Sequence, residues 1–334
     1  MRIESKITKF MNSQLRQDPV SGDWIVIAPG RAKKHIVKKQ KRLKAPIKSC
    51  PFENPQASGN GEPVLLYEGK KDWVLQVIPN RNPALTPRDI CPKISKSGPY
   101  STVDGVGRHD VLITRDHNKN FQNLSNSDAN LVFKAFKERY KILTEDNCEA
   151  YISIFNNWGP KAGASVYHPH YQMISIPVVP PDVQHSLFGS SAYFKKNKKC
   201  VHCEMIKWEK EVKRRIIFEN KGAIVFTPFV SREPFEVRIF PKKHLPYFEE
   251  TSETDLKFMV EALQKALAKI DKKLGDPDCN FFIHTAPTLN KGNYKHYHWH
   301  IEVQPKISIS AGFELSTGIE ITVVDPDEAA KILK

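Results

Sequence analysis

The sequence lacks any apolar run long enough to cross a membrane, because its longest hydrophobic stretches are only as long as a strand. Residues 1–19 carry charge throughout and lack the apolar core of a secretory signal peptide. Six cysteines in 334 residues are too few for a disulfide framework, and no low-complexity tract is present. These absences exclude an integral membrane protein and favour a globular protein of the cytoplasm.

The chain carries a surplus of positive charge, +14 at neutral pH, which implies an anionic partner such as a nucleotide, a sugar phosphate or a nucleic acid. Part of the surplus is local, since residues 31–44 contain eight Lys or Arg residues. The start of this run, Pro29-Gly30-Arg31, follows an apolar strand predicted for residues 24–27, so Arg31 is a candidate for facing phosphate. Residues 38–44 fit a solvated basic loop equally well.

One ordered series of metal-binding residue types occurs twice. The first copy has Cys50 and Glu53, then His117, then His168-Pro169-His170-Tyr171-Gln172, and the second has Cys200 and Cys203, then His244, then His296-Tyr297-His298-Trp299-His300. The spacing from the middle to the later histidine is 51 residues in one copy and 54 in the other. A duplicated unit that repeats its chemical residues indicates an enzyme.

The predicted secondary structure also repeats. Strands are expected at residues 152–155 and 172–179 around a loop rich in Gly and Asn, and again at residues 281–283 and 299–304. A helix is expected after Ser127-Asp128, and a second from Ser252-x-x-Asp255 to Gly275. We therefore predict an α+β fold of two related halves, each a mostly antiparallel sheet with packed helices, at residues 1–185 and 186–334.

The second copy has the donors of a tetrahedral zinc site. Cys200 and Cys203 supply two thiolates, and His244 and His298 are the candidates for the other two ligands. The alternative is a pair of buried free cysteines with unrelated surface histidines. His202, inside the C-x-x-C loop, should point outward.

The first copy replaces one of these thiolates with a carboxylate. Its candidate ligands are Cys50, Glu53, His117 and His168, and carboxylates do bind zinc. The site is therefore either a zinc site of mixed donors or a weak or empty one.

His170 is the candidate nucleophile. It lies two residues after His168 in an extended chain, so both imidazoles project from the same side, and Pro169 restrains the backbone between them. A neutral imidazole attacks phosphorus readily and leaves readily afterwards. The preceding loop, with Asn157, Gly163 and Ser165, offers small residues and N–H donors for phosphate oxygens, as does the amide of Gln172. The alternative is a pair of structural histidines.

These motifs resemble the histidine-triad superfamily and, within it, the galactose-1-phosphate uridylyltransferase family. The resemblance covers nearly the whole chain and rests on Arg16-x-Asp18-Pro19-x-x-Gly22-x-Trp24, Cys50-Pro51-Phe52, Asn157-x-Gly159, the string from Gly163 to Gln172, His298-Trp299-His300, and Ala311-Gly312-Phe313-Glu314-Leu315.

The resemblance implies a ping-pong reaction. His170 would attack the α-phosphorus of a UDP-sugar, and a hexose 1-phosphate such as galactose 1-phosphate would then take the nucleotide. The nucleotide would contact Arg31, Asn80, Asn157, Gly163, Ser165 and Gln172, and the hexose would lie near Phe313 and Glu314. Both sets of metal ligands match the family's structural metals. His300 would be the non-catalytic counterpart of His170.

Three features depart from the family pattern. Arg81 falls where an acidic residue often helps to select uridine, and the segment Phe313-Glu314-Leu315-Ser316-Thr317-Gly318 also resembles members that act on ADP-glucose. Tyr171 is also bulky where many members have a small residue.

We therefore predict a UDP-glucose–hexose-1-phosphate uridylyltransferase that uses zinc, with an ADP-glucose phosphorylase or an adenylyl-specific dinucleotide phosphorylase as the alternative. The predicted partners are a UDP-sugar and a hexose 1-phosphate, with no membrane, and relatives often form homodimers that complete each other's sites. A zinc-dependent nucleic-acid-binding protein is a distant alternative. It predicts aromatic residues among the basic ones, and residues 31–44 have none.

Overall fold

The computed structural model describes residues 12–334 apart from 35–41, 43, 89 and 146–147. Six α-helices are assigned in these residues: α1 (Asn126–Thr144), α2 (Pro181–Asn197), α3 (Val201–Val212), α4 (Glu253–Leu274), α5 (Gly312–Thr317) and α6 (Pro326–Leu333). The strands are β1 (Gln14–Gln17), β2 (Trp24–Ile27), β3 (Leu65–Glu68), β4 (Trp73–Pro79), β5 (Ser95–Ser97), β6 (Tyr100–Thr102), β7 (His109–Thr114), β8 (Tyr151–Trp158), β9 (His170–Ile176), β10 (Ile216–Glu219), β11 (Ala223–Phe226), β12 (Val237–Pro241), β13 (Cys279–His284), β14 (His300–Pro305) and β15 (Ile321–Thr322).

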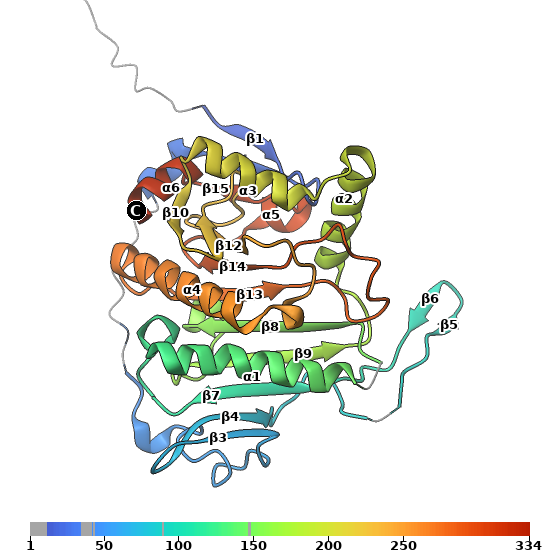
Figure 1. The fold of residues 1–334 in the computed structure, drawn as a ribbon, viewed down its shortest axis with the longest axis vertical. Coiled ribbons are helices and arrows are strands. Elements are labelled where there is room, and N and C mark those ends of the chain that lie inside the picture. Colours follow the sequence, from blue (N-terminus) through green and yellow to red (C-terminus); the bar gives the residue numbers. More distant parts are fainter. Residues whose placement is uncertain (1–11, 35–41, 43, 89, 146–147) are drawn as a thin grey trace, which may run out of the picture.

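Ten strands form one antiparallel sheet in the order β10-β11-β12-β14-β13-β8-β9-β7-β4-β3 (Figure 1). The order is symmetric about its centre, where β8 and β13 pair. The next strands outward, β9 and β14, begin at His170 and His300, within the two histidine clusters. The predicted α+β fold of two related halves, each a mostly antiparallel sheet with packed helices, is therefore confirmed, and each half contributes five strands. Both halves share one continuous sheet.

Helices α1 and α4 cover one face of this sheet, one for each half (Figure 1). Helix α4 begins at Ser252 as the sequence indicated, whereas α1 begins at Asn126, before the predicted Ser127-Asp128. In both helices the hydroxyl of the preceding serine, Ser125 or Ser252, accepts from the backbone N–H three residues later. Helix α4 ends at Gly275, whose φ of 77° places it in the left-handed region. Their buried apolar residues join the strands in one core.

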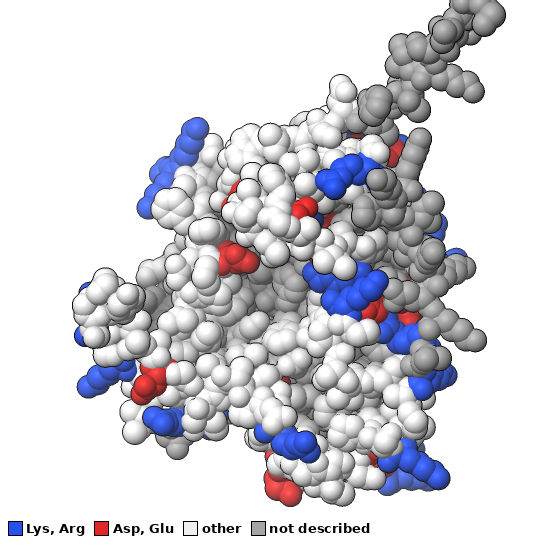
Figure 2. All heavy atoms as spheres, turned by 180° about the vertical axis from the view of Figure 1, so that it is seen from behind, with Lys and Arg blue, Asp and Glu red and all other residues white. Residues whose placement is uncertain are grey.

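The alternation of side chains along β9 places the catalytic candidates on the opposite face. Tyr171 points toward the helices, with its ring 5.6 Å from that of Phe136 in α1, and it is fully buried. Because strand residues alternate between faces, His170 and Gln172 point away from the helices. Figure 2 shows this other side of the molecule, where a hollow near the middle has a group of Lys and Arg side chains beside it.

The ends of the chain meet on the second half. Strands β1 and β2 form a small sheet with β15, and Arg16 pairs with Asp325 at 2.6 Å. Helix α2 spans the predicted boundary between the two halves. The boundary at residue 185 stays a prediction, and the early strands lie with the later half.

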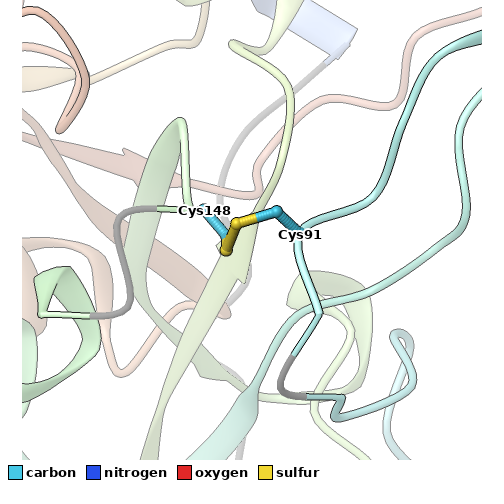
Figure 3. Close-up of a disulfide and its surroundings, with 2 residues drawn as sticks. All are labelled: Cys91 and Cys148. Atoms are coloured by element: carbon cyan, nitrogen blue, oxygen red, sulfur yellow. A yellow bond between two sulfur atoms is a disulfide. The ribbon is translucent and has the colours of Figure 1, made fainter.

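One disulfide joins Cys91, in the segment between β4 and β5, to Cys148, between α1 and β8 (Figure 3). The sequence had indicated no disulfide framework, and the other four cysteines are free. A single bridge between distant loops depends on tertiary proximity, which spacing does not reveal. Within the described residues, no helix is long and apolar enough to span a membrane.

Candidate active site

His170 is the first residue of β9, and its ring is held in one tautomer. Its Nδ1 lies 2.9 Å from the backbone oxygen of His168, which can only accept, so Nδ1 carries the proton and Nε2 carries the lone pair. Burial lowers the pKa of His170, which favours the neutral ring. No described residue makes a hydrogen bond to Nε2. The ring therefore presents a free nucleophilic nitrogen.

Gln172 and Asn80 lie next to a histidine that the sequence did not single out, His109. The Gln172 Oε1 lies 2.8 Å from His109 Nε2, and the Asn80 Nδ2 lies 3.0 Å from the same atom. The antiparallel pairing of β7 with β9 brings these residues together, since Val111 faces Gln172. The structure thus unites two predicted nucleotide-binding residues, one of them on the strand that begins with His170.

The loop before the histidine cluster turns at two glycines. Gly159 and Gly163 have φ values of 87° and 86°, which favour glycine, and they enclose the short helix Pro160–Ala162. Asn280 of β13 donates its Nδ2 to Asn157 Oδ1 at 2.8 Å, so the Asn157 amide nitrogen turns outward beside Gly163. Ser165, in the same loop, is exposed.

This loop is braced by acidic residues of the second half. The backbone N–H of Lys161 donates to Asp278 Oδ2 at 2.6 Å, and Asp278 also pairs with Arg42 at 2.8 Å. The Arg42 guanidinium lies over the Trp158 ring, 4.5 Å from its centroid. The loop that leads to His170 is therefore held in place by the second half of the sheet.

The first set of predicted metal ligands converges. The donor atoms of Cys50, Glu53, His117 and His168 all lie within 4.8 Å of one another. Glu53 Oε1 is 3.0 Å from His117 Nδ1 and 3.4 Å from His168 Nδ1. The other nitrogen of each histidine faces a backbone carbonyl, at 3.1 Å and 2.7 Å. Both Nδ1 lone pairs therefore meet a carboxylate oxygen, an arrangement that fits a cation between them.

Arg115 orients the carboxylate of this first set. Its Nη1 lies 2.6 Å from Glu53 Oε2, which leaves Oε1 to face the histidines. Burial acts to raise the pKa of Glu53, but the Arg115 guanidinium outweighs it and lowers that pKa. Burial lowers the pKa of His168 to about 4. An ionised carboxylate and a neutral imidazole are the protonation states in which these groups bind metals.

The second set, Cys200, Cys203, His244 and His298, also has all its donor atoms within 4.8 Å of one another. Cys203 Sγ lies 3.3 Å from His244 Nδ1 and 3.6 Å from His298 Nδ1. Cys200 is the N-cap of α3, where the helix dipole favours a thiolate, and the hydrogen bond from Cys203 lowers the pKa of Cys200. Two sulfur and two nitrogen donors suit tetrahedral zinc.

The prediction for His202 was wrong. The first turn of α3 turns this side chain inward, and only 1% of it is exposed. Its ring packs against Phe240 and His300, at centroid distances of 5.7 Å and 5.3 Å. The expectation assumed an open C-x-x-C loop, but a helical turn directs the residue between the cysteines into the protein.

His300 repeats the tautomer of His170 and is similarly buried, with 4% exposed against 7%, but its Nε2 has a partner. Its Nδ1 donates to the backbone oxygen of His298 at 3.1 Å, while its Nε2 lies 3.5 Å from Glu302 Oε1. The ring is stacked between Phe240 and His284, at 4.7 Å and 4.9 Å. Burial lowers the pKa of His300 to about 3. An enclosed nitrogen beside a carboxylate is poorly placed to attack a phosphate.

Three predicted substrate residues lie away from His170. Arg31 follows β2, in the small sheet that packs with the second half. Phe313 and Glu314 lie in α5, where Glu314 accepts from the backbone N–H of Ala311 at 3.0 Å and Phe313 is 47% exposed. Among the described residues, no contact links any of the three to His170. Figure 1 shows α5 in the upper half and β9 in the lower.

Comparison with known proteins relates this whole arrangement to one family of enzymes. The family described as "Domain of unknown function (DUF4921)" matches residues 68–333. ADP-glucose phosphorylase of Arabidopsis thaliana is 32% identical over 96% of this chain and 92% of that protein. Galactose-1-phosphate uridylyltransferase of Thermotoga maritima is 25% identical over 96% of this chain and 98% of that protein. The chain belongs to the galactose-1-phosphate uridylyltransferase family.

Solved structures within the galactose-1-phosphate uridylyltransferase family agree with the fold. A crystal structure of the Arabidopsis ADP-glucose phosphorylase with bound ADP-glucose superposes with a TM-score of 0.82 at 30% identity, and covers 96% of this chain and 98% of that one. A uridylyltransferase structure gives 0.74 at 26% identity, with 96% and 97% covered. Members of this family are nucleotidyltransferases and phosphorylases, and both kinds are similar to this chain.

Proposed function

We propose that this protein transfers a nucleotidyl group from a nucleotide sugar to a second acceptor through a covalent intermediate on His170. The observation that carries the proposal is the ring of His170. The backbone oxygen of His168 holds its Nδ1 proton, and among the described residues Nε2 has no hydrogen-bond partner. Imidazole in this state is a nucleophile suited to phosphorus.

The donor we propose is ADP-glucose and the acceptor is inorganic phosphate. His170 Nε2 bonds to the α-phosphorus, the bond from that phosphorus to the bridging oxygen breaks, and glucose 1-phosphate leaves. A phosphate oxygen then bonds to the same phosphorus, the N–P bond breaks, and ADP leaves with His170 restored. The 32% identity to an ADP-glucose phosphorylase supports this choice, as does the exposed Arg81 where uridine-specific members often have an acid.

Uridylyl transfer from UDP-glucose to galactose 1-phosphate is the second candidate. It uses the same intermediate and replaces inorganic phosphate with a hexose 1-phosphate as the attacking group. The similarity to the uridylyltransferases supports it, at 25% identity over nearly the full length. The two reactions differ in the base and in the acceptor.

We further propose that both donor sets hold zinc. Cys200, Cys203, His244 and His298 would form one site, and Cys50, Glu53, His117 and His168 the other. Bound zinc would supply structural rigidity, because each set fixes the residue two positions before a β-strand histidine. At the first site this residue is His168, whose backbone oxygen orients His170.

A substrate comparison tests the proposed reaction. The purified protein is given ADP-glucose with inorganic phosphate, or UDP-glucose with galactose 1-phosphate, and the products are measured by chromatography. We expect ADP and glucose 1-phosphate in the first mixture at a rate at least tenfold above nucleotide exchange in the second. Faster formation of UDP-galactose in the second mixture would overturn the choice of ADP-glucose and phosphate.

A further inference from the structure

His109 lies between two amide side chains that the proposed function assigns to nucleotide binding. Its Nε2 is 2.8 Å from Gln172 Oε1 and 3.0 Å from Asn80 Nδ2. Its Nδ1 lies 3.2 Å from the backbone nitrogen of Ala84. None of the recognised family motifs includes this histidine, yet it contacts three groups from two separate segments, the loop after β4 and strand β9.

The contact with Ala84 determines the tautomer of His109. A backbone N–H can only donate, so Nδ1 accepts and has no proton. The neutral ring therefore carries its proton on Nε2. That N–H donates to Gln172, and only the oxygen end of the Gln172 carboxamide can accept it. The amide nitrogen of Gln172 is consequently turned away from His109, and no described residue pairs with it.

The hydrogen bonds of Asn80 also define the orientation of its amide. Its Oδ1 accepts from the backbone N–H of Asn82 at 2.9 Å, so its Nδ2 is the end nearest the ring. Because the Nε2 of His109 already carries a proton, the Asn80 N–H groups need another acceptor. The backbone N–H of Asn80 also donates to the carbonyl of His109 at 2.7 Å, which fixes the loop to β7.

We propose that His109 is a positioning residue for nucleotidyl transfer. It fixes Gln172 so that the amide N–H groups face the phosphates, on the same side of β9 as His170. A chain of hydrogen bonds thus runs from the Ala84 backbone through His109 to the Gln172 amide. Donors held in this way can stabilise the charge that develops on the phosphate oxygens without reorganising during the reaction. The inference rests on the proposed function.

A double-mutant cycle tests the proposal. The rate at which His170 becomes nucleotidylated is measured in a single turnover, by quenching and intact-protein mass spectrometry, with the nucleotide sugar that labels the wild type. His109→Leu and Gln172→Leu should each slow this step by about 10- to 100-fold. If His109 acts through Gln172, the double variant should be no slower than Gln172→Leu alone.

Two further variants separate positioning from a general structural role. His109→Gln keeps an N–H donor at the same number of bonds from the backbone and should recover most of the rate. His185→Leu removes an exposed histidine of α2 and should leave the rate unchanged. If His109→Leu does not fold, the cycle is run with His109→Asn, whose side chain is too short to reach Gln172.

Losses that multiply in the double variant would overturn the positioning role, as would a His109→Gln variant no faster than His109→Leu. A failure of the proposed function is distinguishable, because the wild-type protein itself would then form no adduct with ADP-glucose or with UDP-glucose. If the wild type is nucleotidylated and the His109 variants are nucleotidylated at the same rate, the proposed function stands and only this inference is refuted.

Discussion

At the scale of single residues, His170 differs from His300 in what surrounds Nε2. Both rings donate Nδ1–H to the carbonyl two residues earlier, so the backbone geometry of the two halves is the same. Glu302 and two stacked rings enclose His300, whereas the equivalent nitrogen of His170 is free of protein partners among the described residues. The two halves orient this histidine in the same way, and the residues around Nε2 distinguish the two rings.

Replacing His170 tests this difference. His170→Ala should lower turnover by at least about 10³-fold, because the covalent route needs the imidazole nitrogen. Circular dichroism and metal content should match the wild type. His300→Asn is the control in the second half and should retain turnover within a few-fold. Equal losses of turnover in both variants would contradict the assignment of a single nucleophile.

The convergence of both donor sets, and the side of the strand on which His170 lies, could be predicted from the sequence because each motif is local or repeated. Positions 168 and 170 share a side of a strand, and the C-x-x-C spacing fits one turn. His109 and Asn280 could not be found, since each matters through a cross-strand partner, Gln172 and Asn157 respectively. Their contacts depend on strand register, which a single sequence does not define.

At the scale of elements, the loop between β8 and β9 depends on close packing against the second half. A methyl group placed on Gly159 would lie 2.1 Å from Asp278 Oδ1, and the φ of 87° is itself unfavourable for other residues. The loop can therefore accept only glycine at this position without moving its backbone.

We expect Gly159→Ala to lower kcat by about 10- to 100-fold, because small displacements of positioned groups are costly in catalysis. Gly22→Ala is the matched control, since Gly22 has a similar φ of 84° but nothing within 4 Å of an added methyl. That control should lose only about 1 kcal/mol of unfolding free energy and keep its kcat. Similar kcat losses in both variants would show that strain alone explains the effect.

Helix α3 begins at the second donor set, so metal and helix should stabilise each other. His298→Ala should remove one zinc per chain and lower the free energy of unfolding by about 4 kcal/mol or more. Elemental analysis and thermal denaturation with and without a chelator measure both effects. A variant that kept full metal content would refute the assignment of His298 as a ligand.

The Cys91–Cys148 bridge joins the loop after β4 to the loop after α1 across 57 residues of sequence. Chain-entropy arguments give about 4 kcal/mol for closing a loop of this length. We expect Cys148→Ser to lower the melting temperature relative to the oxidised wild type, and a reductant to lower the wild type to the same value. Identical melting curves with and without reductant would mean that the bridge does not stabilise the protein.

At the scale of the whole molecule, the two halves share one sheet but contribute different residues to the candidate site. The first half carries His170, the proposed nucleophile, and the second supplies Asn280 and Asp278, which contact the loop that precedes it. The sequence predicted two related halves correctly, yet it gave no sign that β1 and β2 would pair with β15. Such pairings between distant segments depend on the assembled core and on no local pattern.

Phe313 and Glu314 lie in α5 without a contact to their own His170 among the described residues. We expect them to complete the hexose site of a second copy in a homodimer. His170→Ala and Phe313→Ala should each be impaired when expressed alone, whereas co-expression should restore activity above the sum of the two. Activity equal to that sum would show that each chain forms its own site.

The most direct test of the account is the mass of the intact protein after brief incubation with ADP-glucose or UDP-glucose, without any acceptor. The account predicts a gain of one adenylyl group from ADP-glucose, lost on addition of phosphate and absent in His170→Ala. A uridylyl gain alone would assign the chain to uridylyl transfer. No gain with either nucleotide sugar would contradict the covalent mechanism on His170.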